Sequence, residues 1–168
     1  GRGIGPALEA RDVLAILQNE RDAPEDLRER ALILAGRILE MSLAVPEGHG
    51  TKVAAQILAD GRAWKKFHAM CEAQGGFREP TRSDFTHVMT AASKGVVTAI
   101  DNRKLARAAK LTGAPRAKAA GLELHVPIST TVDAGQPLYT LHAETVGELN
   151  YALEYVQVNK GIISIGGI

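Results

Sequence analysis

The hydrophobic residues in the first part of the chain repeat at helical spacing. Apolar residues recur every three or four positions, which predicts helices over residues 7–18, 27–45, 51–59 and 62–74. Glycine and proline separate these segments. The segment 27–45 is apolar nearly all round, so we expect it to be a helix buried against several neighbours.

From residue 86 onward the pattern changes to β-branched runs and to strict alternation of apolar and polar residues. This pattern predicts strands over residues 86–91, 96–100, 122–128, 137–143 and 162–165, and helices over residues 102–112 and after Thr145. Asp101 precedes one of these helices as a cap, and Thr145 with Glu148 forms a capping box at the other.

The two patterns together predict an α+β fold, in which a helical N-terminal segment precedes a mixed α/β-sheet domain. We expect the helical segment over residues 1–76, a hinge over the polar residues 77–84, and the C-terminal domain over residues 85–168. The glycines near the start, Gly1, Gly3 and Gly5, predict a flexible entry loop before the first helix.

Composition narrows the classes of partner. Lys and Arg number 20 against 19 Asp and Glu, so we expect neither nucleic acid nor a membrane surface as a partner. The single Cys71 excludes an internal disulfide and fits a reducing cytoplasm, and its helical setting predicts a buried, inert thiol. No apolar run approaches the length of about 20 residues that a membrane span needs. We therefore expect a soluble cytoplasmic protein, and the start at Gly1 without a Met suggests a fragment.

Few side chains are arranged for chemistry. The five histidines, His49, His68, His87, His125 and His142, show no i, i+4 spacing of a zinc site. His125 and His142 could meet across neighbouring strands, although ordinary surface positions on a sheet explain them as well. Ser93 and Ser129 lack a nucleophile elbow, so no activated serine is expected. We expect no metal site.

Four segments carry a resemblance to a known family. They are GRGIGPALEARDVLAIL at residues 1–17, GVVTAID at 95–101, LTGAP at 111–115 and AGQPLYTLHAE at 134–144. Their order resembles the C-terminal part of the thymidine phosphorylase family, which includes the pyrimidine nucleoside phosphorylases and the AMP phosphorylases. The resemblance covers nearly the whole chain, which would be roughly the last third of a family member. GIGPALEARD looks more like the AMP phosphorylase branch and its relatives named putative thymidine phosphorylases than like the VGNALEV form common in bacterial thymidine phosphorylases.

This resemblance implies a pentosyltransferase that cleaves the N-glycosidic bond of a nucleoside or nucleotide with phosphate, releasing free base and pentose 1-phosphate. Phosphate would be a co-substrate, and no cofactor is expected. The family's phosphate loop and base-binding set match nothing in this chain, so no catalytic residue is assigned here and the chain alone is expected to be inactive. The full-length protein is expected to be a homo-oligomer.

In the intact family the glycine loop would lie near the cleft between domains. Arg2, Gly3 and Gly5 are therefore the substrate-binding candidates, through a contribution to domain closure. The same loop and helix start could instead cradle phosphate, but Glu9 would repel the anion, which favours a hinge.

Two alternatives from other classes remain open. Lys94 before GVV, with the Gly-x-Pro-Leu turn, also resembles biotinyl and lipoyl carrier domains, which present a modified lysine at the tip of a hairpin. The helix between the strands departs from that pattern. The other alternative is a non-catalytic interaction or regulatory module.

Overall fold

A computed structural model describes residues 1–167, which form two compact units. The first unit contains Gly1 and residues Asp12–Glu79, and the second contains Arg2–Arg11 and the chain from Pro80 onward. The first helix, α1 (Pro6–Leu17), contributes residues to both units. The expected domains over residues 1–76 and 85–168, joined by a hinge over 77–84, stay a prediction about the organisation of the protein.

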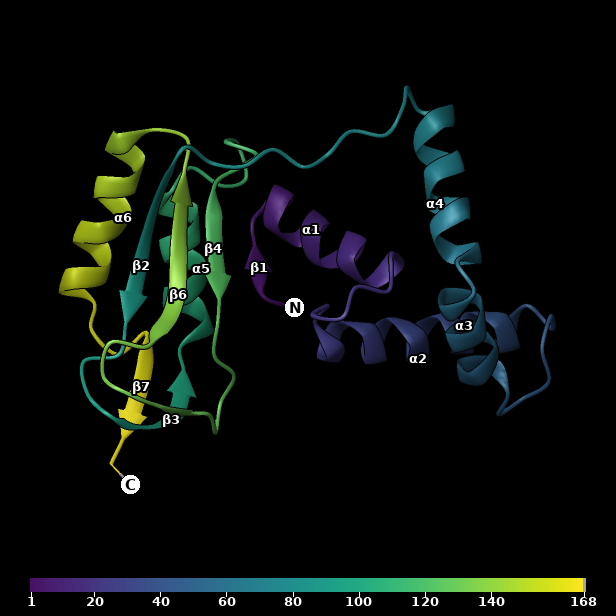
Figure 1. Cartoon of the computed structure of the whole chain (residues 1–168), viewed down its shortest axis with the longest axis horizontal. Coiled ribbons are helices and arrows are strands. Elements are labelled where there is room, and N and C mark those ends of the chain that lie inside the picture. The colour runs from purple at the N-terminus through teal and green to yellow at the C-terminus, as the bar shows by residue number, and fades with distance from the viewer. Residues whose placement is uncertain (168) are drawn as a thin grey trace. The chain divides into compact units, whose positions relative to one another are not determined.

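The first unit is built from helices only (Figure 1). After α1 follow α2 (Glu25–Met41), α3 (Gly50–Ala59) and α4 (Arg62–Ala73). Helices α2 and α3 pack where Gly36 meets Gly50, and a Cβ on either glycine would overlap with the backbone of the other helix. Glu40 of α2 also accepts a hydrogen bond from the Gly50 amide at 2.8 Å, so it caps the start of α3. The contact between these two helices is therefore backbone against backbone.

The prediction that the segment 27–45 is buried against several neighbours is wrong. Helix α2 ends at Met41, and Leu43 adopts a left-handed φ of 58° beyond it. Gly36 is the only residue of α2 that is buried, whereas Leu34 and Ile38 are 59% and 65% exposed. The reason is that α2 is covered on its glycine side by α3 and leaves the opposite apolar face uncovered.

Helix α4 packs aromatic rings against the residue Phe77 that follows it but buries none of its own residues. The ring of Phe77, which follows the helix, lies 5.7 Å from Trp64 and 5.5 Å from His68, measured between centroids. Cys71 on this helix is partly exposed, so the prediction of a buried thiol is wrong.

The second unit contains two antiparallel sheets. The four-stranded sheet has the order β1 (Gly3–Ile4), β4 (Gly121–Leu124), β6 (Pro137–Ala143), β2 (Phe85–Thr90). The three-stranded sheet has the order β5 (Thr131–Val132), β3 (Gly95–Ile100), β7 (Ile163–Gly166). With the helices α5 (Asn102–Leu111) and α6 (Val146–Val158), they form the predicted α+β fold.

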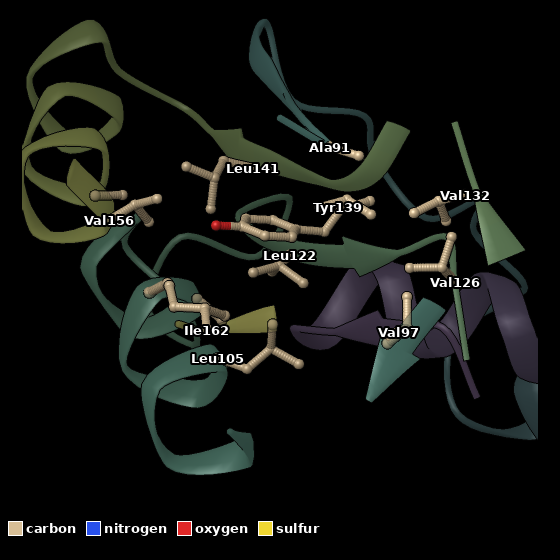
Figure 2. Close-up of a cluster of buried hydrophobic side chains, with 14 residues drawn as sticks. Ala91, Val97, Leu105, Leu122, Val126, Val132, Tyr139, Leu141, Val156 and Ile162 are labelled. Carbon is tan, nitrogen blue, oxygen red and sulfur yellow. The ribbon is translucent and has the colours of Figure 1, made fainter. Parts of the chain in front are cut away.

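One apolar core joins both sheets and both helices. Helix α5 packs on β4 and on α6, and α6 packs on β6 and β2, so the two helices cover one face of the four-stranded sheet. Leu122 and Leu141 point from that sheet toward Leu105 of α5 and Val156 of α6, and Val97 adds the other sheet (Figure 2). Leu122, Leu141 and Val97 are fully buried.

Both predicted helix caps are confirmed. The Asp101 carboxylate accepts hydrogen bonds from the amides of Arg103 and Lys104, each at 3.0 Å. The Thr145 hydroxyl accepts from the Glu148 amide at 3.2 Å and donates to the Glu148 carboxylate at 2.9 Å. These bonds satisfy amides that the first helical turn leaves without partners.

The sheet differs from the prediction at three places. Strand β4 ends at Leu124 instead of continuing to Ile128, because Pro127 has no amide to donate and Ser129 turns the chain with a φ of 71°. Strand β5 was not predicted. The flexible entry loop is also wrong at Gly3 and Ile4, which form β1 and pair with Glu123 and Leu122. No helix within residues 1–167 is long and apolar enough to cross a lipid bilayer.

Candidate functional site

The main group of polar side chains in the second unit lies on the four-stranded sheet, on the face opposite the core. Residues of a strand alternate between faces, so Leu122 and Leu141 enter the core while Glu123, Thr140 and His142 point the other way. Glu123 is paired with Thr140 across the β4–β6 ladder. We call Ser83, Glu123, His125, Thr140 and His142 the sheet-face cluster.

His142 is at the centre of this cluster. Its Nδ1 lies 3.1 Å from the Ser83 hydroxyl, and its Nε2 lies 3.7 Å from Oε2 of Glu123. The second distance is an ion-pair distance but too long for a hydrogen bond. The His142 side chain is only 13% exposed and that of Glu123 is 35% exposed. The neighbouring His125 hydrogen-bonds the Thr140 hydroxyl at 2.7 Å.

Charge around the cluster favours the ionised form of Glu123. The His142 side chain lowers the pKa of Glu123 most, burial opposes this effect, and the charges of His125, His142 and Arg2 lower it further. Arg11 of α1 adds a guanidinium that donates to the backbone oxygen of Thr81. Burial lowers the pKa of Arg11, Arg82 lowers it further, and Glu123 raises it.

The order Ser83, His142, Glu123 has the residue types of a hydrolytic triad but not its geometry. A base in such a triad hydrogen-bonds both the nucleophile and the orienting carboxylate. The 3.7 Å gap between His142 and Glu123 does not meet that condition. These contacts hold the segment that precedes β2 on the sheet. Ser83 is hydrogen-bonded to His142, and the Thr81 carbonyl accepts a hydrogen bond from Arg11.

The substrate-binding candidates Arg2, Gly3 and Gly5 all belong to the second unit. Gly3 pairs with Glu123 in the ladder, and Arg2 adds charge beside Glu123. The Gly5 amide donates to the Glu9 carboxylate at 3.0 Å, so this helix start already holds its own anion. Gly5 and Glu9 line an open pocket of about 490 Å³ together with Lys110 of α5. The role of Arg2, Gly3 and Gly5 in substrate binding or closure stays a prediction.

The other candidates named from the sequence lie in different places. His125 and His142 both belong to the sheet-face cluster, where each binds a different hydroxyl. Within residues 1–167 no three His, Cys, Asp or Glu side chains are grouped as metal ligands. Lys94 forms an exposed ion pair with Asp133 at 3.3 Å. It follows β2 and precedes β3, which belong to different sheets, so it is not at the tip of a hairpin.

Sequence reasoning found only a part of the sheet-face cluster, which is the possible meeting of His125 and His142 across neighbouring strands. The alternation in residues 122–128 already placed Glu123 and His125 on the polar face of a strand. What it did not provide was the contact between His142 and Ser83, since these two residues are 59 residues apart in sequence.

Comparison with known proteins agrees with this architecture. Residues 96–162, which span nearly all of β3 and then α5, β4, β5, β6 and α6, match the family described as "Pyrimidine nucleoside phosphorylase C-terminal domain". The second unit is thus a domain of the nucleoside phosphorylase class. Over nearly its whole length the chain is similar to about a third of proteins named as putative thymidine phosphorylases.

Three relatives illustrate that similarity. A protein of Acidovorax sp. (strain JS42) named "Putative thymidine phosphorylase 1" is 61% identical over 98% of this chain. Proteins named "Putative thymidine phosphorylase" from Legionella pneumophila and Sphingopyxis alaskensis are 55% and 56% identical over 99% and 98% of the chain. In each case the chain covers 32% of the relative, so it spans about a third of the curated relatives that it matches.

Proposed function

We propose that the full-length protein carrying this chain is a pentosyltransferase that cleaves nucleosides or nucleotides with phosphate. A phosphate oxygen attacks the anomeric carbon, the glycosidic C–N bond breaks, and the base leaves with the bonding electrons and takes up a proton. The products are free base and pentose 1-phosphate. The observation that carries this proposal is the 55–61% identity, over nearly all of the chain, to proteins named "Putative thymidine phosphorylase".

The chain itself would act as a scaffold in this enzyme. Phosphorolysis needs donors that hold phosphate and stabilise a charged transition state. The candidate anion site at the start of α1 is filled by Glu9, and the triad-like residues lack the spacing for catalysis. We therefore infer that the catalytic groups lie in the part of the protein outside this chain, and that Arg2, Gly3 and Gly5 contribute to closure.

The best substrate is a separate part of the proposal. The relatives' names favour thymidine, whereas GIGPALEARD at the start of the chain resembles both the AMP phosphorylases and their relatives named putative thymidine phosphorylases, so AMP is the second candidate. The lone cysteine supports a reducing compartment such as the cytoplasm. We also expect a homo-oligomer when the protein is full length.

The experiment is an assay of base release by the full-length protein. Thymidine, uridine, AMP and CMP are each incubated with and without inorganic phosphate, and both the base and the pentose 1-phosphate are quantified. Phosphate-dependent release in a one-to-one ratio supports the proposal, and the substrate with the highest kcat/KM names the branch. Release that does not need phosphate would indicate a hydrolase and contradict it.

A further inference from the structure

A cavity of about 390 Å³ lies in the second unit, where elements of both sheets meet. Its walls come from the end of β2, from β6, from the carboxyl end of α6 and from β7. Most of the lining side chains are apolar, among them Met89, Val156, Ile162 and Ile163. A cavity of this size with apolar walls and a few polar groups has the usual form of a small-molecule site.

Tyr139 is the most buried polar residue that lines this cavity, with only 4% of its surface exposed. Within residues 1–167 its hydroxyl forms no hydrogen bond to another residue, although the oxygen keeps some accessible surface. Figure 2 shows the ring near Leu122 and Leu141, with its oxygen directed toward the end of the core where Val156 lies. A buried hydroxyl without a partner costs free energy, and a bound group that supplies the partner removes that cost.

The lining offers one hydrogen-bond donor and one acceptor to a ligand. Burial raises the pKa of Tyr139 to about 12, so its hydroxyl keeps the proton at neutral pH and can donate it to an oxygen. Asn159 supplies the acceptor. Its backbone and side-chain amide groups both donate to the Tyr155 carbonyl, at 2.8 and 2.9 Å, and among the described residues nothing donates to its side-chain oxygen.

The charges around the cavity favour a neutral ligand. The carboxyl end of α6 carries the negative end of the helix dipole, which disfavours an anion. Lys160, an exposed residue of the lining, disfavours a cation. The apolar walls penalise a charge of either sign. A neutral molecule with an apolar body and an amide group satisfies all of these conditions, because an amide contains both an acceptor and a donor.

We propose that this cavity binds a small neutral amide, whose apolar body packs on Met89 and its apolar neighbours and whose carbonyl accepts a hydrogen bond from the Tyr139 hydroxyl. The side-chain oxygen of Asn159 is the acceptor available to the amide N–H group. The proposal does not depend on phosphorolysis. Its test uses neither nucleoside nor phosphate, so its failure would leave the proposed activity untouched.

Benzamide is the probe, and the three methionines of the chain report where it binds. Met89 lines the cavity, whereas Met41 and Met70 lie on α2 and α4 of the first unit. In a chain with ¹³C-labelled methionine methyl groups, we expect benzamide to shift the Met89 signal saturably and to leave the other two unchanged. Benzoate and benzylamine are of similar size and carry opposite charges, and both should bind several-fold more weakly. No saturable shift at Met89, or equal affinity for the three probes, would overturn the proposal.

One pair of variants tests the hydroxyl itself. Tyr139→Phe keeps the ring, and we expect it to weaken benzamide binding about two- to tenfold, the value of one neutral hydrogen bond. Its melting temperature without ligand should not fall, because the lost hydroxyl has no partner in the chain. Tyr151→Phe, at a residue of α6 that is 67% exposed and outside the cavity, should change neither quantity.

Unchanged affinity in Tyr139→Phe, or a lowered melting temperature, would contradict the role given to the hydroxyl. The same titration is repeated with the full-length protein, in which the Met89 signal is identified by its loss in Met89→Leu. We expect the same saturable shift there. A Met89 signal that no longer responds would overturn the proposal, since the cavity would then be closed in the complete protein.

Discussion

Leu122 and Leu141 of the second unit are enclosed by two sheets and two helices, whereas Leu34 and Ile38 of the first unit are more than half exposed. The core of the second unit is formed by residues from several strands and helices between Ala91 and Ile162. The first unit has one close helix pair at Gly36 and Gly50, and a helix, α4, without a buried residue. The comparison shows that helical periodicity identifies an apolar face but does not say whether the same chain covers it.

The largest difference between the two units is expected when a buried side chain of the second unit is shortened, because this leaves a cavity in its core. Leu141→Ala removes a fully buried side chain, and we expect it to lower the free energy of unfolding by about 2 to 5 kcal/mol. The matched variant Leu34→Ala, at a residue 59% exposed, should change it by less than about 0.5 kcal/mol in this chain. Urea denaturation followed by circular dichroism measures both. Similar losses would mean that α2 is covered within the chain.

The contact between α2 and α3 should be the sensitive point of the first unit. Gly36→Ala inserts a methyl group against the Thr51 amide, so the helices must separate, at a cost of about 1 to 3 kcal/mol. Gly147→Ala is the control, because a Cβ there meets no atom within 4 Å and α6 gains a better helix former. Thermal unfolding monitored by circular dichroism compares them. An unchanged melting temperature for Gly36→Ala would show that the helices do not cross at these glycines.

The cap of α5 should have an intermediate effect. Asp101→Ala leaves the Arg103 and Lys104 amides without their acceptor and should cost about 1 kcal/mol. Asp101→Asn keeps an acceptor oxygen and should recover most of that loss. The denaturation midpoints of the two variants give the comparison, and equal losses would show that charge rather than capping is responsible.

The sheet-face cluster should produce the smallest effect, visible only in acid. The pKa of Glu123 is lowered in the folded protein from its ordinary value of 4.5, so its stabilising contribution is complete above that value and is lost as pH falls through the folded pKa. Glu123→Gln should therefore flatten the acid side of the stability curve, by less than about 1 kcal/mol because the side chain is partly exposed. Unfolding measured from pH 7 to pH 3 tests this, with exposed Glu154→Gln as the control. Parallel curves for wild type and Glu123→Gln would contradict it.

Local signals made much of the second unit predictable. Strand β6 follows from the turn residues that precede it, and the caps at Asp101 and Thr145 follow from side chains that bind amides two or three residues away. Strand β1 was not predictable in this way, because Gly3 and Ile4 are a strand only through pairing with Glu123 and Leu122. A pair of residues carries too little pattern to indicate a partner so distant in sequence.

The candidate site was less predictable for the same reason. Its central contact joins Ser83 to His142, and neither residue stands in a recognisable motif. For α2 the apolar residues were correctly identified, and the expectation that several neighbours bury them was wrong. Helical periodicity shows which face of α2 is apolar. Only the structure shows that α3 packs on the opposite face, at Gly36.

The most direct test of the account is phosphorolysis by this chain and by the full-length protein, measured side by side. Each is incubated with phosphate and either thymidine or AMP, and the pentose 1-phosphate formed is quantified. The account predicts turnover by the full-length protein and none by residues 1–168 alone. Turnover by this chain alone would place the catalytic groups within it and contradict the scaffold role, and silence from the full-length protein would contradict the phosphorylase assignment.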